Sequence, residues 1–462
     1  MQTLAALLST LALAAPSQET LYLRAQYRDP AQDPAAVVDR IVDELLTRGE
    51  AYSKLRALCA TAPHRLSGSD GAQVAVEWAR QTMVADGLEN VRLEPCQVTH
   101  WERGKVEQLS VTSPPEHAGK LLPILALGGS VATSLVGVEG PLVVVESFEE
   151  LRELGDAARG AIVLFNRPME DRLDNTFKAY AGAVDQRVNG ASEAARVGAV
   201  AAIVRSMTMA RDDVPHTGGM RYSPDVHRIP TAAVSTNGAD LLAALVEAGK
   251  EVRLKLRLDC RSLPPADSYN VVGELVGREK PEEVVVVAGH LDSWDVGEGA
   301  HGDGAGCVQA MEVLRVRKAL DLRPRRTLRC VLYMNEENGL GGAQAYYADH
   351  KAEMDSHVLA IESDRGGFTP RGFAAAAVPE AMQRLRKYTG LLARTGVSFV
   401  IPGGGGADIG PMRASGVPLV GFVPDAQRYF DLHHSANDVL SAVHPRELHL
   451  GASAVPEGSG DQ

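Results

Sequence analysis

The spacing of apolar residues predicts helices in the first part of the chain. Apolar residues recur every three or four positions between residues 36 and 46, and again from Val74 to Met83. This spacing gathers them on one side of a helix, as in helices that cover a core. We therefore expect residues 35–90 to be mainly helical.

The pattern changes between residues 105 and 262. Short runs of Val, Ile and Leu are separated there by Gly, Pro and Asp, which is typical of strands joined by turns. One clear helix is expected over residues 191–197. This block reads as a small β-rich domain, and the Pro264-Pro265 pair marks its end. The expected strands include residues 141–145, 161–165 and 199–204.

Continuous apolar strands alternate with helices in the last part of the chain. This alternation predicts a parallel-rich sheet with helices on both faces. In such sheets ligands bind beyond the carboxyl ends of the strands, so functional residues are expected there. The expected strands are residues 283–288, 328–334, 358–361 and 418–423, and the expected helices are residues 306–320 and 342–350.

His and acidic residues follow four of these expected strands. Imidazole nitrogens and carboxylate oxygens are the ligands that a Zn²⁺-type ion prefers. Each group alone is weak evidence for a functional site, but four groups at neighbouring strand ends predict a metal site. The groups are His290 with Asp292, Glu336 with Glu337, Glu362 with Asp364, and His433 and His434 with Asp438.

Two of these groups suggest roles for their members. Asp292 follows His290 by two residues and could hold the imidazole ring by a hydrogen bond from outside the metal shell. The side chains of Glu336 and Glu337 diverge, so one can bind a metal while its neighbour faces water and acts as a base.

Signatures of other enzyme classes are missing or incomplete. The sequence contains neither H-E-x-x-H nor G-x-S-x-G, the marks of helix-borne zinc peptidases and of serine hydrolases. Residues 297–302 match G-x-G-x-x-G, but a segment carrying His290 and Asp292 separates them from the preceding strand. A dinucleotide site needs a tight turn at that point.

Composition limits the classes of protein further. The chain has 462 residues, 45% of them apolar, which is enough for two or three domains. A net charge of −12 argues against a nucleic-acid binder. No apolar stretch is long enough for a membrane span. The basic residues between 315 and 329 lack aromatic neighbours and are expected to form a solvated helix face and connection.

The N-terminus and the cysteines bear on the compartment. Residues 4–15 have the length and composition of the apolar region of a signal peptide, and residues 12–14 resemble a cleavage site. Export is favoured over a buried or amphipathic N-terminal segment. The five Cys are scattered without C-x-x-C, so they are expected to act as small hydrophobic residues, with one disulfide left open.

In this order the motifs resemble the carboxypeptidase Q-type (plasma glutamate carboxypeptidase) di-zinc exopeptidases, which are related to bacterial zinc aminopeptidases. The likeness runs from His64–Ser69 through residues 181–190 and 289–295 to residues 429–434. It implies an α/β fold, with a zinc-exopeptidase-type mixed sheet flanked by helices and an inserted protease-associated β-rich domain. The implied parts are a split catalytic domain (20–105 and 263–450) and the insert (106–262). The N-terminal pattern adds a signal peptide (1–15), and the composition of the chain end adds a disordered tail (451–462).

The resemblance also implies a function. The chain would be a metallo-exopeptidase that hydrolyses dipeptides or short peptides by metal-activated water. His290 and Asp364 would bind one zinc, and Glu337 and His434 would bind the other. Glu336 would be the general base. A peptide substrate and a homodimer are implied by the same resemblance, whereas the N-terminal apolar run predicts a secreted or periplasmic location.

One position departs from the family pattern. The family has a metal-bridging Asp where this chain has Gly302, within His301-Gly302-Asp303. Without that carboxylate each zinc keeps two recognised ligands, fewer than the three of typical catalytic sites. One possibility is that His301 or Asp303 replaces the bridging Asp, and Asp303 is the candidate that we name. The other is that the site holds one zinc or none.

Loss of the bridging Asp leaves two alternatives open. The first is a non-catalytic pseudoenzyme or binding protein on the same fold. The second is a mono-zinc acyl-transfer or cyclising enzyme. The end of the chain also departs from the family: residues 454–462 are rich in Gly, Pro, Ser and acids, so no closing helix is expected there.

Overall fold

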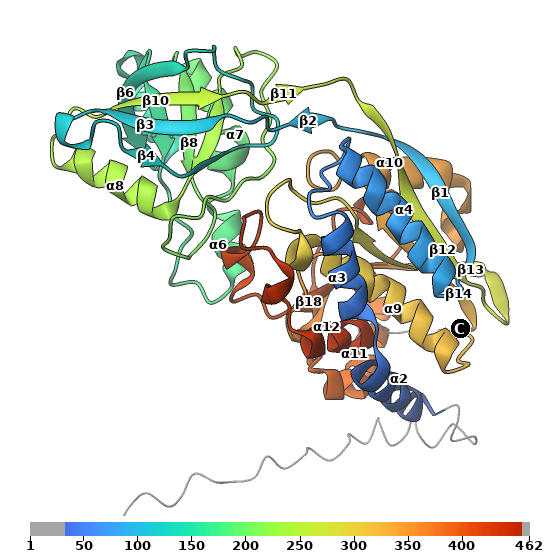
Figure 1. Ribbon diagram of the computed structural model, residues 1–462. Helices are drawn as coiled ribbons and strands as arrows, with labels where there is room; N and C mark the ends of the chain where they lie inside the picture. The colour runs from blue at the N-terminus through green and yellow to red at the C-terminus, as the bar shows by residue number, and fades with distance from the viewer. Residues whose placement is uncertain (1–32, 455–462) are drawn as a thin grey trace, which may run out of the picture.

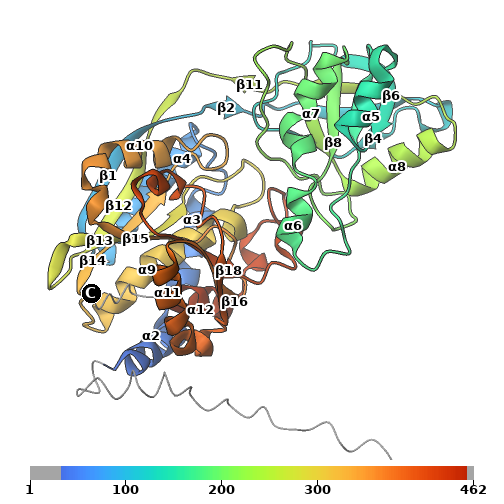
Figure 2. The same ribbon diagram turned by 180° about the vertical axis from the view of Figure 1, so that it is seen from behind.

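The structure, a computed structural model, describes residues 33–454, which form two lobes (Figures 1 and 2). The lobes are joined by two chain segments whose short strands β2 (Trp101–Glu102) and β11 (Arg261–Ser262) pair with each other. The expected signal peptide lies outside the described residues. Within residues 33–454 no helix has both the length and the apolar character needed to cross a membrane.

The large lobe is built on an eight-stranded mixed sheet, as expected. Its central strands β14, β13, β15 and β18 run parallel, whereas β12 and β16 are antiparallel to their inner neighbours. The strands in spatial order are β1 (Glu89–Val98), β12 (Ala266–Leu275), β14 (Arg326–Tyr333), β13 (Lys280–His290), β15 (His357–Glu362), β18 (Leu419–Pro424), β16 (Pro370–Ala376) and β17 (Phe399–Pro402).

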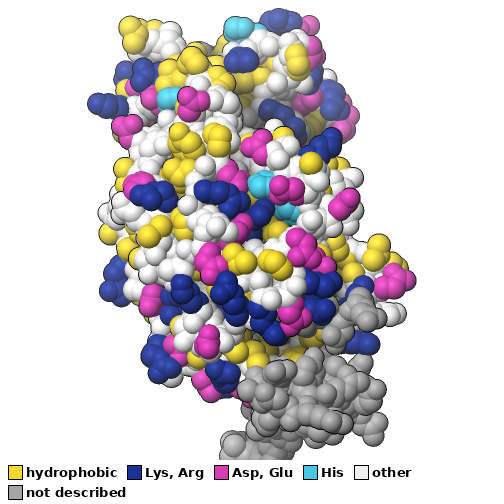
Figure 3. All heavy atoms as spheres, turned by 90° about the vertical axis from the view of Figure 1, so that its right-hand side faces the viewer, with side chains coloured by type: hydrophobic (Ala, Val, Ile, Leu, Met, Phe, Trp, Pro, Cys, Tyr) yellow, Lys and Arg dark blue, Asp and Glu magenta, His cyan; other side chains and the backbone are white. Residues whose placement is uncertain are grey.

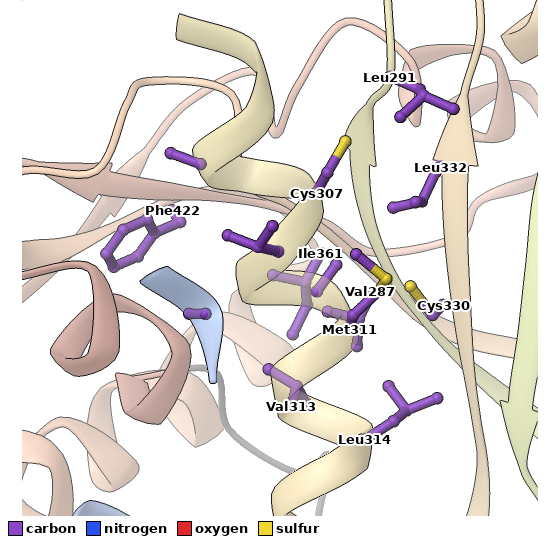
Figure 4. Close-up of a cluster of buried hydrophobic side chains, with 14 of the residues drawn as sticks. Val287, Leu291, Cys307, Met311, Val313, Leu314, Cys330, Leu332, Ile361 and Phe422 are labelled. Carbon is purple, nitrogen blue, oxygen red and sulfur yellow. The ribbon is translucent and has the colours of Figure 1, made fainter. Parts of the chain in front are cut away.

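Helices cover both faces of this sheet. Alternate residues of β13 belong to different cores: Val285 and Val287 face one helical layer, whereas Val284 and Val286 face the other. In the first layer, Met311 and Leu314 of α9 belong to the same core as Val287 of the sheet (Figure 4). This layer comprises α2 (Pro34–Arg48), α3 (Ala51–Thr61), α4 (Asp70–Ala85), α9 (Ala305–Ala319), α11 (Pro379–Leu392) and α12 (Pro445–Ala454), and the other layer contains α10 (Gly341–Asp349).

All five cysteines lie within the described residues, buried and without a disulfide partner. Cys307 and Cys330 belong to the core between α9 and the sheet (Figure 4). Burial raises the pKa of the Cys307 thiol to about 12. The cysteines therefore serve as small hydrophobic residues, as the sequence predicted.

The small lobe contains a second eight-stranded sheet, and it is less purely β than expected. Its strands β6 to β9 are parallel neighbours, and helices lie in the connections from β6 to β7 and from β7 to β8. The one helix predicted there begins six residues earlier, at Asp185, because polar residues on its outer face interrupt the apolar pattern. The elements are β3 (Glu107–Ser113), β4 (Leu121–Leu122), β5 (Ile124–Ala126), β6 (Val138–Val145), β7 (Ile162–Phe165), β8 (Ala201–Arg205), β9 (Thr231–Val234), β10 (Arg253–Leu258), α5 (Phe148–Leu154), α6 (Thr176–Ala181), α7 (Asp185–Arg196) and α8 (Thr236–Glu247).

The expectation of a disordered tail from residue 451 is wrong for residues 451–454. These residues form the last turn of α12 and are buried against α2 and α9. Small residues are common in disordered tails, but here they allow close helix packing: Gly451 lies directly against the Gln309 amide. The remaining residues of the expected tail lie outside the described part of the chain.

The basic segment between residues 315 and 329 is also not the solvated face that was expected. Arg315, Arg317 and Arg329 are buried. Arg329 Nε donates to Glu274 at 2.7 Å, and outer members of the segment pair with acids on neighbouring turns. Figure 3 shows basic and acidic side chains interspersed on this side of the molecule. The segment is therefore part of a network of ion pairs.

The buried Glu312 predicts a pH-dependent contribution to stability. It accepts hydrogen bonds from Lys54 Nζ at 2.7 Å and Arg315 Nε at 2.6 Å. Burial alone would raise the pKa of Glu312, but the Arg315 hydrogen bond and the Lys54 charge outweigh it, so the pKa is lowered. A lowered pKa stabilises the fold above the unfolded value of about 4.3, and the contribution disappears as the pH falls through the folded value.

We expect Glu312→Gln to lower the free energy of unfolding at pH 7 by about 3 kcal/mol, because two buried cations each lose one of their carboxylate partners. The difference from the wild type should shrink as the pH falls below about 4. Urea denaturation at several pH values measures it. Glu77→Gln, which removes an exposed pair with Arg80, is the matched control and should change the midpoint little. A constant difference at all pH values would contradict the assignment.

Candidate metal centre and active site

A cavity of about 310 Å³ opens where the central strands of the large lobe end. Each predicted group reaches it from the loop after a different strand, as the topology requires. His290 ends β13, whereas Glu336 and Glu337 follow β14. The cavity brings together all the predicted catalytic and metal-binding residues, namely His290, Asp303, Glu336, Glu337, Asp364 and His434.

The donors form two pairs, with a further carboxylate between them. His290 Nε2 lies 3.1 Å from Asp364 Oδ1, and His434 Nε2 lies 3.0 Å from Glu337 Oε2. Asp303 Oδ1 lies 3.7 Å from His290 Nε2, and its carboxyl group shares a hydrogen bond with Glu337. Asp303 therefore contacts one member of each pair.

A π-helical turn places Asp303 there. Residues Ala300–Gly304 form this turn, in which the Gly304 N–H donates to the Gly299 carbonyl, five residues earlier, at 2.9 Å. Asp438 fixes the turn: its carboxylate accepts from the N–H groups of His301 at 2.5 Å and of Gly302 at 3.0 Å. A Cβ atom on Gly302 would lie 3.3 Å from Asp438 Oδ2, so position 302 faces Asp438.

His301, the other residue considered for the missing ligand, points elsewhere. Its ring packs on Phe368 with the centroids 3.9 Å apart, and neither ring nitrogen has a hydrogen-bond partner among the described residues. Burial lowers the pKa of His301 to about 3, so the ring is neutral. Of the two candidates, Asp303 is the one that faces the donor pairs.

Asp292 acts differently from the expectation. His290 Nδ1 donates its hydrogen bond to the Asp292 backbone carbonyl at 3.0 Å, whereas the Asp292 carboxylate lies 3.9 Å from that nitrogen. The carboxylate instead accepts from the backbone N–H groups of Asn335 at 2.8 Å, Glu336 at 3.0 Å and Glu337 at 3.3 Å. The buried Asp292 side chain thus fixes the turn that carries both glutamates.

The charges of the site favour a bound cation. Burial raises the pKa of Glu337 to about 7, and it raises the pKa values of Asp303 and Glu336 well above the ordinary range. Neighbouring carboxylates raise them further: Asp364 acts on Glu336, and Glu337 acts on Asp303. A divalent cation among these groups would offset the cost of their burial.

The donor chemistry fits zinc, which binds imidazole and carboxylate ligands. Within residues 33–454 no three His, Cys, Asp or Glu side chains already surround one point, because the donors stand in pairs. Asp303 is the carboxylate that can complete either pair. With it, each pair would have three protein donors, the number typical of catalytic zinc.

The small lobe helps to hold His434. Thr217 N donates to the His434 carbonyl at 2.9 Å, and His216 Nδ1 lies 2.7 Å from the His433 carbonyl. His434 has a backbone φ of +60°, a conformation that residues other than Gly rarely adopt. Aromatic contacts join the lobes beside it: Tyr180 of α6 stacks on Phe430 with the centroids 4.7 Å apart. The docking of the two lobes thus stabilises a strained site residue.

Two arginines of the site were missed as functional candidates, and Asp438 was expected in the metal-site group but contacts the backbone of the π-helical turn instead; all three lie within segments noted in the sequence. Asp438 fixes the π-helical turn, and Arg187 lines the cavity. Arg65 is fully buried and donates to the carbonyls of Leu291 at 2.6 Å and Gly299 at 2.6 Å. The motifs contained these residues, but only their long-range contacts show what they do.

Known proteins resemble this chain over both lobes. The profile of peptidase family M28 matches residues 270–455. Carboxypeptidase Q of Bos taurus is 38% identical over 406 residues, which are 88% of this chain and 84% of the bovine protein. A peptidase M28 precursor from Shewanella amazonensis superposes with a TM-score of 0.87 at 33% identity, covering 91% of this chain and 94% of that chain. A zinc aminopeptidase from Bacillus subtilis shares the fold at 20% identity, with a TM-score of 0.61 and coverage of 88% and 93%.

Proposed function

The chain belongs to peptidase family M28, and from this membership we propose that it is a zinc-dependent exopeptidase that hydrolyses dipeptides or short peptides. The observation that carries the proposal is the cavity in which two His–carboxylate pairs and a further glutamate meet. The curated relative named carboxypeptidase Q supports an exopeptidase, and the cavity volume of about 310 Å³ suits a short peptide.

We assign the metal ligands by the two pairs. His290 and Asp364 would hold one zinc, and Glu337 and His434 would hold the other. Asp303 would bind both ions, in the role that the family gives to the position of Gly302. Its contacts with His290 and Glu337 support this assignment.

Glu336 is the general base in the proposed reaction. Its side chain lines the cavity that also contains both donor pairs, and its backbone N–H donates to the Asp292 carboxylate at 3.0 Å. A carboxylate in this place can take the proton from the attacking water and return it to the nitrogen of the leaving amine. Zinc in the site would supply Lewis-acid chemistry that polarises the peptide carbonyl.

Gly302 is the observation that favours the alternative, a chain that has kept the fold without the activity. A mono-zinc acyl-transfer or cyclising enzyme would follow from the same loss. We favour the peptidase because the π-helical turn brings Asp303 to the two donor pairs, so the glycine does not leave the site without a shared carboxylate.

We also propose the division of the chain given by the family resemblance. Residues 106–262 would be an inserted protease-associated-like domain, and residues 20–105 and 263–450 the split catalytic domain. The second sheet supports this division because its strands come only from residues 107–258. A secreted or periplasmic location and a homodimer stay predictions.

Hydrolysis of unblocked dipeptides by the purified full-length chain tests the proposed function. We expect release of free amino acids, loss of activity after removal of metal by a chelator, and recovery on addition of zinc. The control substrates are the same dipeptides blocked at both ends. Zinc-loaded, folded protein that cleaves no dipeptide from a panel of varied side chains would contradict the proposal.

A further inference from the structure

Trp294 connects the metal-site segment of the large lobe to the core of the small lobe. It lies between β13, which ends at His290, and the π-helical turn. Its side chain is 2% exposed and belongs to the same hydrophobic core as residues of β3, β8 and β10. Its indole lies directly against the Gly128 backbone, where any Cβ atom would overlap it. The motif that carries His290 thus also contains an anchor in the other lobe, which metal binding alone does not explain.

Asp295 adds a buried ion pair to this anchor. Its partner Arg103 is 8% exposed and follows β2, in one of the two segments that join the lobes (Figure 1). Arg103 Nε and Nη2 donate to the Asp295 carboxylate at 2.9 Å and 2.6 Å, and Nη1 donates to the Ala126 carbonyl of the small lobe at 2.6 Å. A bidentate pair of this kind fixes the mutual orientation of its members. Arg103 therefore ties Asp295 to the small lobe in one geometry.

Both anchors lead to His434. Arg103 Nη2 lies 3.4 Å from Thr217 Oγ1, which itself donates to the Ala126 carbonyl at 2.8 Å. The backbone N–H of Thr217 donates to the His434 carbonyl at 2.9 Å. The Trp294 ring lies beside the His434 ring, with the centroids 5.7 Å apart. The backbone and the ring of His434 are thus both in contact with residues that the anchors hold.

Another buried arginine of the small lobe shows what distinguishes this ion pair. Arg205 is also 8% exposed, and its Nη1 atom donates to Asp240 at 2.5 Å. Both members of that pair belong to the small lobe, in β8 and α8. The pair of Arg103 and Asp295 instead crosses between the lobes. Because buried ion pairs add little net stability, the effect expected of this pair is a fixed orientation of the lobes.

We propose that a latch formed by Trp294, Asp295 and Arg103 holds the small lobe in the orientation in which it positions His434 for metal binding. None of the three latch residues is among those that line the cavity. They are therefore positioning residues that act through His434. This inference rests on the proposed function, in which His434 and Glu337 hold one of two zinc ions.

Hydrogen exchange in the metal-free protein tests the latch itself. Asp295→Asn keeps the shape of the side chain but removes the charge that binds Arg103. The Thr217 amide, which donates to His434, should exchange about 10-fold faster than in the wild type, because a buried charged partner is lost. Arg103→Lys keeps the charge without the fork of donors, so its increase should be smaller. Unchanged exchange at Thr217 in Asp295→Asn would overturn the proposal.

Asp240→Asn is the matched control because it breaks the ion pair with Arg205 inside the small lobe. It should leave the exchange of Thr217 at the wild-type rate. Gly128→Ala loosens the latch from its other side, since the new Cβ atom would displace the Trp294 indole. It should speed the exchange of Thr217, as Asp295→Asn does. An equal increase in Asp240→Asn would show a general loosening of the small lobe and would overturn the proposal.

Zinc release separates this inference from the proposed activity. Zinc-loaded proteins are mixed with an excess of a colorimetric chelator, and release is followed without any peptide. In Asp295→Asn one zinc per chain should leave about 10-fold faster than in the wild type while the other keeps its rate, because residues that support a ligand typically change metal affinity by this factor or more. In a His434→Ala background, Asp295→Asn should have no further effect.

The outcomes of the zinc experiment bear separately on the latch and on the proposed function. Equal acceleration of both zinc ions in Asp295→Asn, or an effect that persists in His434→Ala, would overturn the latch. Zinc-loaded wild type that cleaves no dipeptide would contradict the peptidase but not the latch. If the wild type holds no zinc, the proposed function fails, and the exchange of Thr217 alone decides the latch.

Discussion

Replacing Glu336 by Gln is expected to lower kcat for dipeptide hydrolysis by about 10³-fold while the protein keeps its metal. Gln has the shape of Glu but cannot accept the proton of the attacking water. The backbone of residue 336 stays in place because its N–H donates to Asp292, whatever the side chain. Steady-state kinetics with zinc analysis of the same preparation measures both quantities.

Glu282, an exposed residue at the start of β13, provides the control for this change. Glu282→Gln removes the same charge far from the cavity, and its kcat should match that of the wild type. Activity of Glu336→Gln within a few-fold of the wild type would show that another group is the base. Loss of zinc along with activity would show instead that Glu336 is a metal ligand.

Replacing Asp303 by Asn is expected to lower kcat/KM by about 10²-fold or more, because in the proposed site both zinc ions would lose a ligand. Asn keeps the size of the Asp side chain and its capacity to hydrogen-bond Glu337. His301→Asn alters the neighbouring residue, whose ring packs on Phe368 away from the donors. Its kcat/KM should stay much closer to that of the wild type, and equal losses in the two variants would contradict the role of Asp303.

Gly302→Asp restores the Asp that the family has at this position. It distinguishes a site in which Asp303 replaces the bridging Asp from a site in which the bridge is lost. In the structure a Cβ atom at position 302 faces Asp438 Oδ2 at 3.3 Å. A new carboxylate there would meet a like charge, so we expect no gain in zinc content or activity. A clear gain in both would mean that the bridge is lost in the wild type and that Asp303 does not replace it.

The sequence predicts the centre of the fold better than its edges. The apolar run of β13 is buried on both faces, so its pattern is local and unambiguous. β1, at the edge of the sheet, mixes polar and apolar residues and was not predicted. The last turn of α12 was missed because small residues indicate either disorder or close packing, and only the partner helix distinguishes the two.

The residues of the site also differ in how well the sequence predicts them. His290 and Asp364 were predictable because the end of a parallel strand fixes where they lie. Asp303 depends on a π-helical turn that Asp438 stabilises from more than 100 residues away in the chain, which no local pattern reveals. Arg187 reaches the cavity only because the small lobe docks on the loop that carries His434. Contacts of this range need the tertiary structure.

The zinc content of the wild type and of Asp303→Asn tests most directly whether Asp303 takes the bridging role. Both proteins would be loaded with zinc, dialysed and analysed for metal per folded chain. We predict about two zinc ions per wild-type chain and one or none in the variant. Wild-type protein without bound zinc, or equal zinc content in the two proteins, would contradict the account.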